Sequence, residues 1–201
     1  MSKKFRIAAY LVLLLLIASV PLYCAVHAAT HLLFPSLILT AAQDGDTVGV
    51  AGLLRNGADI ESKNVTGMTP LMRAAEFGHT GTVKYLLRHG ANLNVRDMSG
   101  FTPLRVAASP GNHAGTVAFL LQYGANPNAV DNQGMTALIW ASAYGNPATV
   151  KVLVQHGASV NVRDRQGETA LAMALGDRRE LPGNIGNARS ARILKAAGAR
   201  M

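Results

Sequence analysis

Apolar and polar positions recur along most of this chain in a unit of 33 residues. The segments 68–100 and 135–167 are identical at 17 of 33 aligned positions without a gap, and 101–134 is the same unit lengthened by one residue. Segment 35–67 keeps the same frame, and 168–201 is a degraded copy. Self-similarity at this period is typical of stacked repeats, in which each unit buries its apolar side against its neighbours. The pattern therefore predicts a stacked array rather than a single compact globule.

Each unit contains the signals of two short helices. The first begins at a threonine such as Thr69, which can accept hydrogen bonds from the free N–H groups at a helix N-terminus. The second carries apolar residues at helical spacing, as at Val83, Leu86 and Leu87, and ends at a Gly-Ala pair, where glycine takes the left-handed conformation at little cost. A polar turn, as at 94–100, then closes the unit and resembles a hairpin finger.

The order of these motifs resembles the ankyrin repeat family. The family pattern is Thr-Pro-Leu-His-x-Ala-Ala, then Gly, Leu-Leu and Gly-Ala-Asp/Asn-x-Asn, and it covers nearly all of residues 35–201. The resemblance implies an all-α fold, namely an ankyrin-type helix-turn-helix solenoid with β-hairpin-like fingers, preceded by an N-terminal hydrophobic helix. We therefore divide the chain into an N-terminal segment, 1–34, and a repeat domain, 35–201, which we expect to be monomeric.

The chain departs from the family pattern at the histidine that follows Leu. Four units carry another residue there, namely Met72, Arg105, Ile139 and Ala172. We therefore expect no histidine network between neighbouring units and a somewhat lower stability. The last unit has about eight extra residues, roughly 179–186, which predict a longer loop between its two helices and fit a terminal capping unit.

The hydrophobic N-terminal segment bears on where the protein resides. Residues 7–42 contain no Asp, Glu, Lys or Arg, and three basic residues precede them. The 23 residues 7–29 are long enough to cross a bilayer as a helix. The same features, with a small-x-small sequence ending at Ala28, also fit a cleaved signal peptide. We favour the membrane anchor, but either interpretation places the repeats on the extracytoplasmic side, which is the periplasm in a bacterium.

Composition adds no candidate chemistry to this picture. Cys24 is the only cysteine, so the repeat domain has neither a disulfide nor a thiol site. The six histidines form no metal-binding pair, and the eleven acidic residues form no paired carboxylates at a spacing suited to acid–base work. The chain has no phosphate-binding loop and no nucleophile-elbow motif. We therefore expect no enzymatic activity, no metal and no cofactor.

Positive charge is prominent in the last unit, within a net charge of +8 for the whole chain. Arginines that could meet an acidic partner or an anionic membrane surface are Arg178, Arg179, Arg189 and Arg192. A solvated cap is the alternative interpretation of the same residues. We do not expect nucleic acid as a partner, because the repeats would face away from it.

The family resemblance also implies a partner-binding surface made of the fingers and the first helix of each unit. The positions it implies are Val65, Met68, Glu76, Phe77, Met98, Phe101, Gln133, Met135, Trp140, Tyr144 and Arg165. Aromatic residues and methionine are enriched at protein interfaces, but they could equally fill contacts between repeats. We favour packing for Phe77 and Tyr144 and the surface for Met68 and Phe101, and we leave Trp140 open.

These observations predict a non-catalytic scaffold or adaptor for protein–protein interaction. It would be exported, tethered through residues 7–29, and bound to another protein on its concave face. Two alternatives stay open at this stage. One is an inhibitor of the immunity type, which blocks a toxic or lytic enzyme that is expected to be acidic. The other is a protein that binds anionic membrane through its basic C-terminal unit.

Overall fold

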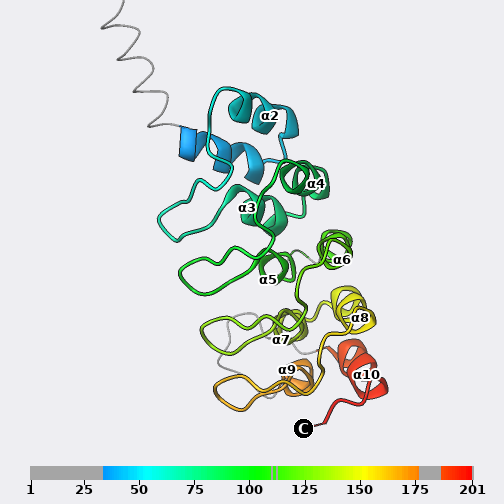
Figure 1. Ribbon diagram of the computed structural model, residues 1–201. Coiled ribbons are helices and arrows are strands. Elements are labelled where there is room, and N and C mark those ends of the chain that lie inside the picture. Colours follow the sequence, from blue (N-terminus) through cyan, green and yellow to red (C-terminus); the bar gives the residue numbers. More distant parts are fainter. Residues whose placement is uncertain (1–33, 110, 112, 177–186, 201) are drawn as a thin grey trace, which may run out of the picture.

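The computed structural model describes residues 34–176 and 187–200, apart from 110 and 112. The described chain is a row of helix pairs joined by extended fingers (Figure 1), which confirms the predicted all-α repeat architecture. No helix in the described part is long and apolar enough to cross a membrane. The predicted anchor, 7–29, and the predicted loop, 179–186, lie outside the described residues.

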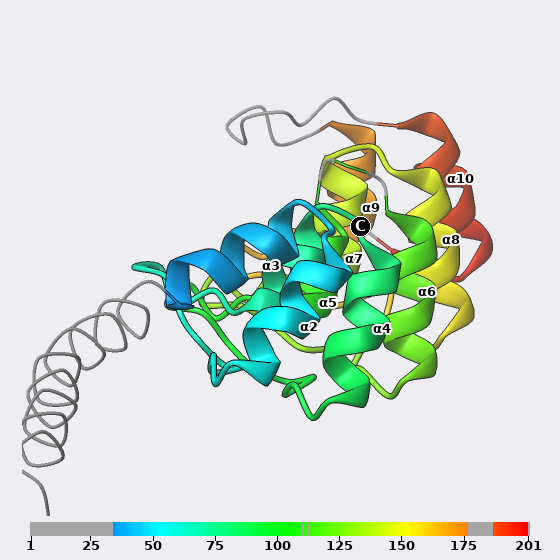
Figure 2. The same ribbon diagram turned by 90° about the horizontal axis from the view of Figure 1, so that it is seen from above.

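The helices form two rows. Residues 34–43 are helical and are followed by α2 (Thr47–Arg55), α3 (Pro70–Glu76), α4 (Thr80–Arg88), α5 (Pro103–Ala107), α6 (Ala114–Gln122), α7 (Ala137–Ala143), α8 (Pro147–Gln155), α9 (Ala170–Leu175) and α10 (Ala188–Ala196). Helices α3, α5, α7 and α9 make an inner row beside the fingers, and α4, α6, α8 and α10 run side by side in an outer row (Figures 1 and 2).

The inner helices begin where the sequence predicts. In each, a threonine hydroxyl accepts a hydrogen bond from the backbone N–H three residues later, at 3.2–3.4 Å. The four threonines, all buried, are Thr69, Thr102, Thr136 and Thr169. Packing removes water from the N–H groups at the start of the helix, and the threonine hydroxyl accepts in its place. The cap therefore supports packing as well as helix initiation.

The fingers are held by a repeated side-chain turn. In each finger an Asn or Asp Oδ1 accepts from the backbone N–H groups two and four residues ahead, at 2.8–3.0 Å. The four residues are Asn64, Asp97, Asp131 and Asp164. Successive fingers are joined by single backbone hydrogen bonds of 3.0 Å, such as Met98 N–H to the Thr66 carbonyl. The fingers thus form one continuous edge along the stack.

The core runs through all described units without interruption. Leucines of the inner helices (Leu71, Leu104, Leu138) and of the outer helices (Leu86, Leu120) are almost completely buried in it. Three of the four residues that replace the expected histidine are buried apolar side chains, namely Met72, Ile139 and Ala172. The fourth, Arg105, is a buried charge and is described below.

Truncating the chain after Gly167 removes α9 and α10, which pack against α7 and α8. Their apolar faces would then meet water, so we expect aggregation that depends on protein concentration, together with a lower unfolding temperature. Sedimentation velocity and thermal melting followed by circular dichroism measure both effects. A truncated chain that stays monomeric and unfolds cooperatively at the full-length temperature would contradict this prediction.

Candidate protein-binding surface

The inner face, which we define as the fingers together with α3, α5, α7 and α9, places most of the predicted binding residues within reach of a partner. Five of the eleven are exposed, namely Val65, Phe77, Met98, Gln133 and Arg165. Five more are partly buried, namely Met68, Glu76, Phe101, Trp140 and Tyr144. Val65 and Met98 are the most exposed large apolar residues of the fingers, at 89% and 74%.

Met135 does not lie on this surface, contrary to the prediction. Its side chain is only 2% exposed and belongs to the core. Asp131 fixes the backbone of Met135 from both sides, because its Oδ1 accepts from the Met135 N–H and its own N–H donates to the Met135 carbonyl. The adjacent Thr136 pairs with Val130 across the base of the finger. Met68 and Phe101 stay partly exposed although the same pair of hydrogen bonds holds their backbones, so the burial of Met135 comes from side-chain packing in the core.

The third finger presents a residue that the sequence analysis missed. The residue directly after the turn-forming Asn or Asp is Val65, Met98 and Arg165 in three fingers, and in the third it is Asn132 rather than Gln133. Asn132 is exposed, and its Nδ2 donates to the Met98 carbonyl at 3.0 Å. The fingertips therefore change from apolar at the N-terminal end of the stack to polar and basic at the C-terminal end.

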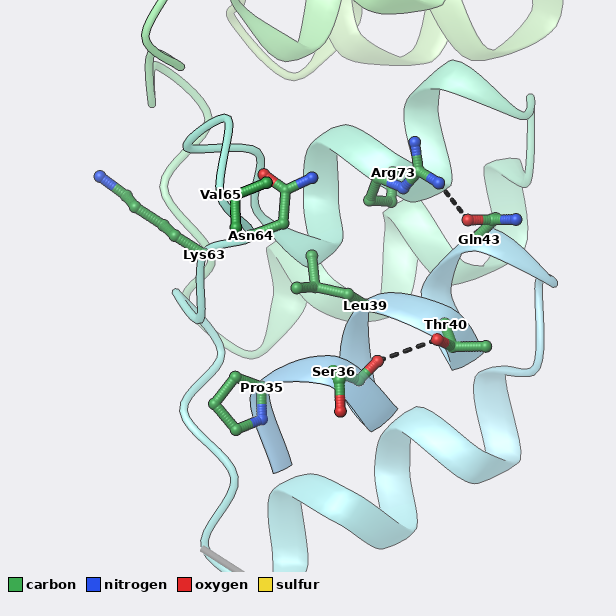
Figure 3. Close-up of a pocket in the computed structure, with 9 residues that line it drawn as sticks. All are labelled: Pro35, Ser36, Leu39, Thr40, Gln43, Lys63, Asn64, Val65 and Arg73. Atoms are coloured by element: carbon green, nitrogen blue, oxygen red, sulfur yellow. Dashed lines mark hydrogen bonds between the residues drawn. The ribbon is translucent and has the colours of Figure 1, made fainter. Parts of the chain in front are cut away.

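A groove of about 440 Å³ opens at the apolar end of the inner face, between helix 34–43 and the first finger. We call it the first groove, and Figure 3 shows Leu39 reaching from the helix toward Val65 of that finger. The residues that line it are Pro35, Ser36, Leu39, Thr40, Gln43, Lys63, Asn64, Val65 and Arg73. Arg73 is fixed at its edge, because its guanidinium donates to Gln43 and forms a 2.6 Å ion pair with Glu76.

A second, smaller cavity of about 260 Å³ lies between the second and third fingers. It is lined by Met98, Ser99, Phe101, Asp131, Asn132, Gln133 and Trp140. Because Val65 borders the first groove and Met98 borders this cavity, the two exposed apolar fingertips stand between the two hollows.

Arg105 fills the space behind the second cavity. Its guanidinium carbon lies 3.3 Å from the centroid of the Phe101 ring and 3.7 Å from that of Trp140, so the cation is sandwiched between two aromatic faces. Arg105 Nε is 3.6 Å from Asp131 Oδ2, and the same oxygen accepts from Trp140 Nε1 at 3.0 Å. The Tyr144 ring in turn stacks on Trp140, with centroids 5.4 Å apart.

The buried guanidinium is incompletely paired. Arg105 is 5% exposed, and its Nε and Nη2 have no hydrogen-bond acceptor among the described residues. Burial lowers the pKa of Arg105 to about 10, although the nearby Asp131 carboxylate acts in the opposite direction. The side chain stays protonated at neutral pH, where its burial costs stability. Because the unfolded chain holds the proton more tightly, this group alone would make the free energy of unfolding rise as the pH increases above about 10.

These contacts resolve several of the interpretations left open by the sequence. Trp140 both packs against Arg105 and lines the second cavity. Tyr144 packs on Trp140, whereas Phe77 is 43% exposed beside Arg73. Of the four arginines predicted to meet an acidic partner or an anionic surface, Arg189 and Arg192 are exposed on α10, and the other two, 178 and 179, lie outside the described residues. The described residues contain no group of three His, Cys, Asp or Glu that could hold a metal ion.

Replacing Asp131 with Asn should destabilise the fold by about 3 kcal/mol, because Arg105 loses its counter-charge and the new amide turns a donor toward Trp140 Nε1. The finger turn itself should survive, since Asn64 already makes this turn in the first finger. With Arg105 replaced by Met, the same change should cost only about 1–2 kcal/mol. Urea unfolding measures these differences.

Asp97→Asn is the matched control for that series, because Asp97 makes the equivalent turn, has no ion-pair partner within 4 Å among the described residues, and acts on Arg105 only as a weaker charge than Asp131. It should change the free energy of unfolding by less than about 1 kcal/mol. Equal losses for Asp97→Asn and Asp131→Asn would show that the turn matters and that the buried charge does not.

Comparison with known proteins agrees with this architecture. A family model described as ankyrin repeats, in three copies, matches residues 38–131 and 112–181. No curated protein matches the chain. Ankyrin repeats are modules for protein–protein interaction and are typically not catalytic. On its repeat period, its capped helix pairs and this match, the chain belongs to the ankyrin repeat family.

Proposed function

We propose that this protein is a non-catalytic scaffold that binds another protein on the inner face of its repeat stack. The observation that carries the proposal is the pair of exposed apolar fingertips, Val65 and Met98, with a hollow beside each. Single exposed apolar residues are common on protein surfaces. These two belong to neighbouring fingers that are joined by the hydrogen bond from Met98 N–H to the Thr66 carbonyl, so a partner would meet them together.

The inner face also provides the rigidity that tight binding requires. Each finger is closed by its own side-chain turn and joined to the next, so little conformational freedom remains to be lost when a partner binds. Half-buried aromatic side chains at the floor, Phe101 and Trp140, are held against Arg105. An apolar centre with aromatic residues and a polar rim is the usual composition of a protein interface.

We further propose that the repeats work on the extracytoplasmic side of a membrane, anchored by residues 7–29. The support is the run of 23 residues without charge that follows three basic residues. Inhibition of an enzyme in that compartment is one form that such binding could take.

Photo-crosslinking tests the binding face. A photoreactive amino acid at Met98 or Gln133, both exposed on the fingers, should give one dominant protein adduct in cells of the source organism. The same amino acid at Val48 of α2 or Lys151 of α8, exposed on the outer helices, should give none. Mass spectrometry of the adducts identifies the partner. Adducts of equal yield from the outer positions would place binding elsewhere on the protein.

Protease protection tests the location. We expect a C-terminal tag to be digested once the outer envelope has been opened, while the full-length chain is recovered in the membrane pellet of undigested cells. A shortened chain outside the pellet would instead support cleavage of the leader near Ala28. A tag that is protected until the inner membrane is broken would contradict the proposed orientation.

A further inference from the structure

The first groove has an apolar floor and a donor-rich wall. Leu39 and Val65 face it from opposite sides (Figure 3), and Pro35 lines its lower end. Its volume of about 440 Å³ lies within the range of roughly 300–1,000 Å³ that is usual for ligand sites. One aliphatic side chain and a short stretch of backbone would fit within it.

Hydrogen bonds inside the protein already occupy the amide oxygens of this wall. Asn64 Oδ1 accepts from the N–H groups of Thr66 and Met68 and from the Thr66 hydroxyl, at 2.8–3.0 Å. Gln43 Oε1 accepts from the Arg73 guanidinium, and the Gln43 carbonyl accepts from His79 Nε2 at 2.8 Å. Each of these oxygens thus already accepts from a group of the protein, and Asn64 Oδ1 from three.

The donors of the same wall remain available. With Oδ1 fixed by three hydrogen bonds, the orientation of the Asn64 amide is set, and its Nδ2 donates to no acceptor among the described residues. Lys63 is exposed and forms no ion pair with the described part of the chain. Among the described residues no Asp or Glu lines the groove, and the Glu76 carboxylate is paired with Arg73. The groove therefore favours a ligand that brings acceptors and negative charge.

We propose that the first groove binds an extended segment of the protein partner in which an aliphatic residue stands next to an aspartate or glutamate. The aliphatic side chain packs between Leu39 and Val65. The neighbouring carboxylate accepts from Asn64 Nδ2 and pairs with the ammonium of Lys63, whose exposed side chain points outward in Figure 3 and turns toward the groove when the segment binds. This inference rests on the proposed function and specifies the chemistry that the inner face selects.

Selection from a library of random peptides tests the inference without knowledge of the partner. The full-length chain, solubilised in detergent and immobilised through a C-terminal tag, is screened against dodecapeptides displayed on phage. We expect enriched sequences to share an aliphatic residue beside Asp or Glu. Synthetic copies with blocked ends should lose at least tenfold in affinity when the acidic residue is replaced by its amide.

Variants of the groove should weaken the selected peptides in a defined way. Asn64→Asp is the sharpest, because three other fingers use Asp for the same turn, so the fold is kept while the donor becomes a repelling carboxylate. We expect it, and Lys63→Glu, each to reduce affinity at least tenfold, as measured by fluorescence polarisation. Asp97→Asn in the next finger and Lys151→Glu on α8 are the matched controls and should bind like the unchanged protein.

Two kinds of result would overturn the inference. One is a selection that yields no enriched peptide, or peptides without the acidic residue. The other is binding that resists both Asn64→Asp and Lys63→Glu. If peptides depend instead on Met98 or Gln133, the inference fails while the proposed binding on the inner face stands. If crosslinking also finds a partner only on the outer helices, both are wrong.

Discussion

Burial of each helix pair against the next is the constraint on which this structure depends. The inner helices are only five to seven residues long and the outer ones nine, too short to be stable alone in water. Their leucines reach the core only because a neighbouring unit covers them, as α5 covers α3 and α9 covers α7. Every other feature follows from this dependence. The caps satisfy helix ends that stacking has removed from water, and the end units must close an otherwise open apolar face.

Arg105 is the exception that shows how costly polarity is inside such a stack. Three sister positions hold apolar side chains, whereas Arg105 stays buried with its charge between two aromatic faces, one of them Trp140 of the following unit, and beside the Asp131 carboxylate of its own unit. The same residues, Phe101, Trp140 and Asp131, form the floor of the second cavity. The charge therefore links the third unit to the fourth and holds part of the proposed binding surface in place.

The residues that can determine which partner binds are those that make no contact needed for stacking. In each finger, backbone groups form hydrogen bonds within the turn and to the next finger, and one side-chain oxygen accepts from the backbone of the turn. The residue that follows the turn-forming Asn or Asp is left free to vary, and it changes from Val65 and Met98 to Asn132 and Arg165 along the stack. A partner can thus be distinguished by an apolar anchor at one end and by charge at the other, without any change to the fold.

The sequence by itself determined the repeat period, the helix starts at threonine, the glycine ends and the all-α stack, because caps, turns and apolar spacing are local signals within one unit. It also placed Val65 and Met98 on the surface, but it favoured packing for Phe77, which is 43% exposed. Only the tertiary structure decided the burial of Met135 and Arg105. It alone assembled the first groove, from a helix that begins near residue 35, a finger at 63–65 and Arg73. These features depend on how one unit packs against the next, and the spacing of residues within a single unit does not predict that packing.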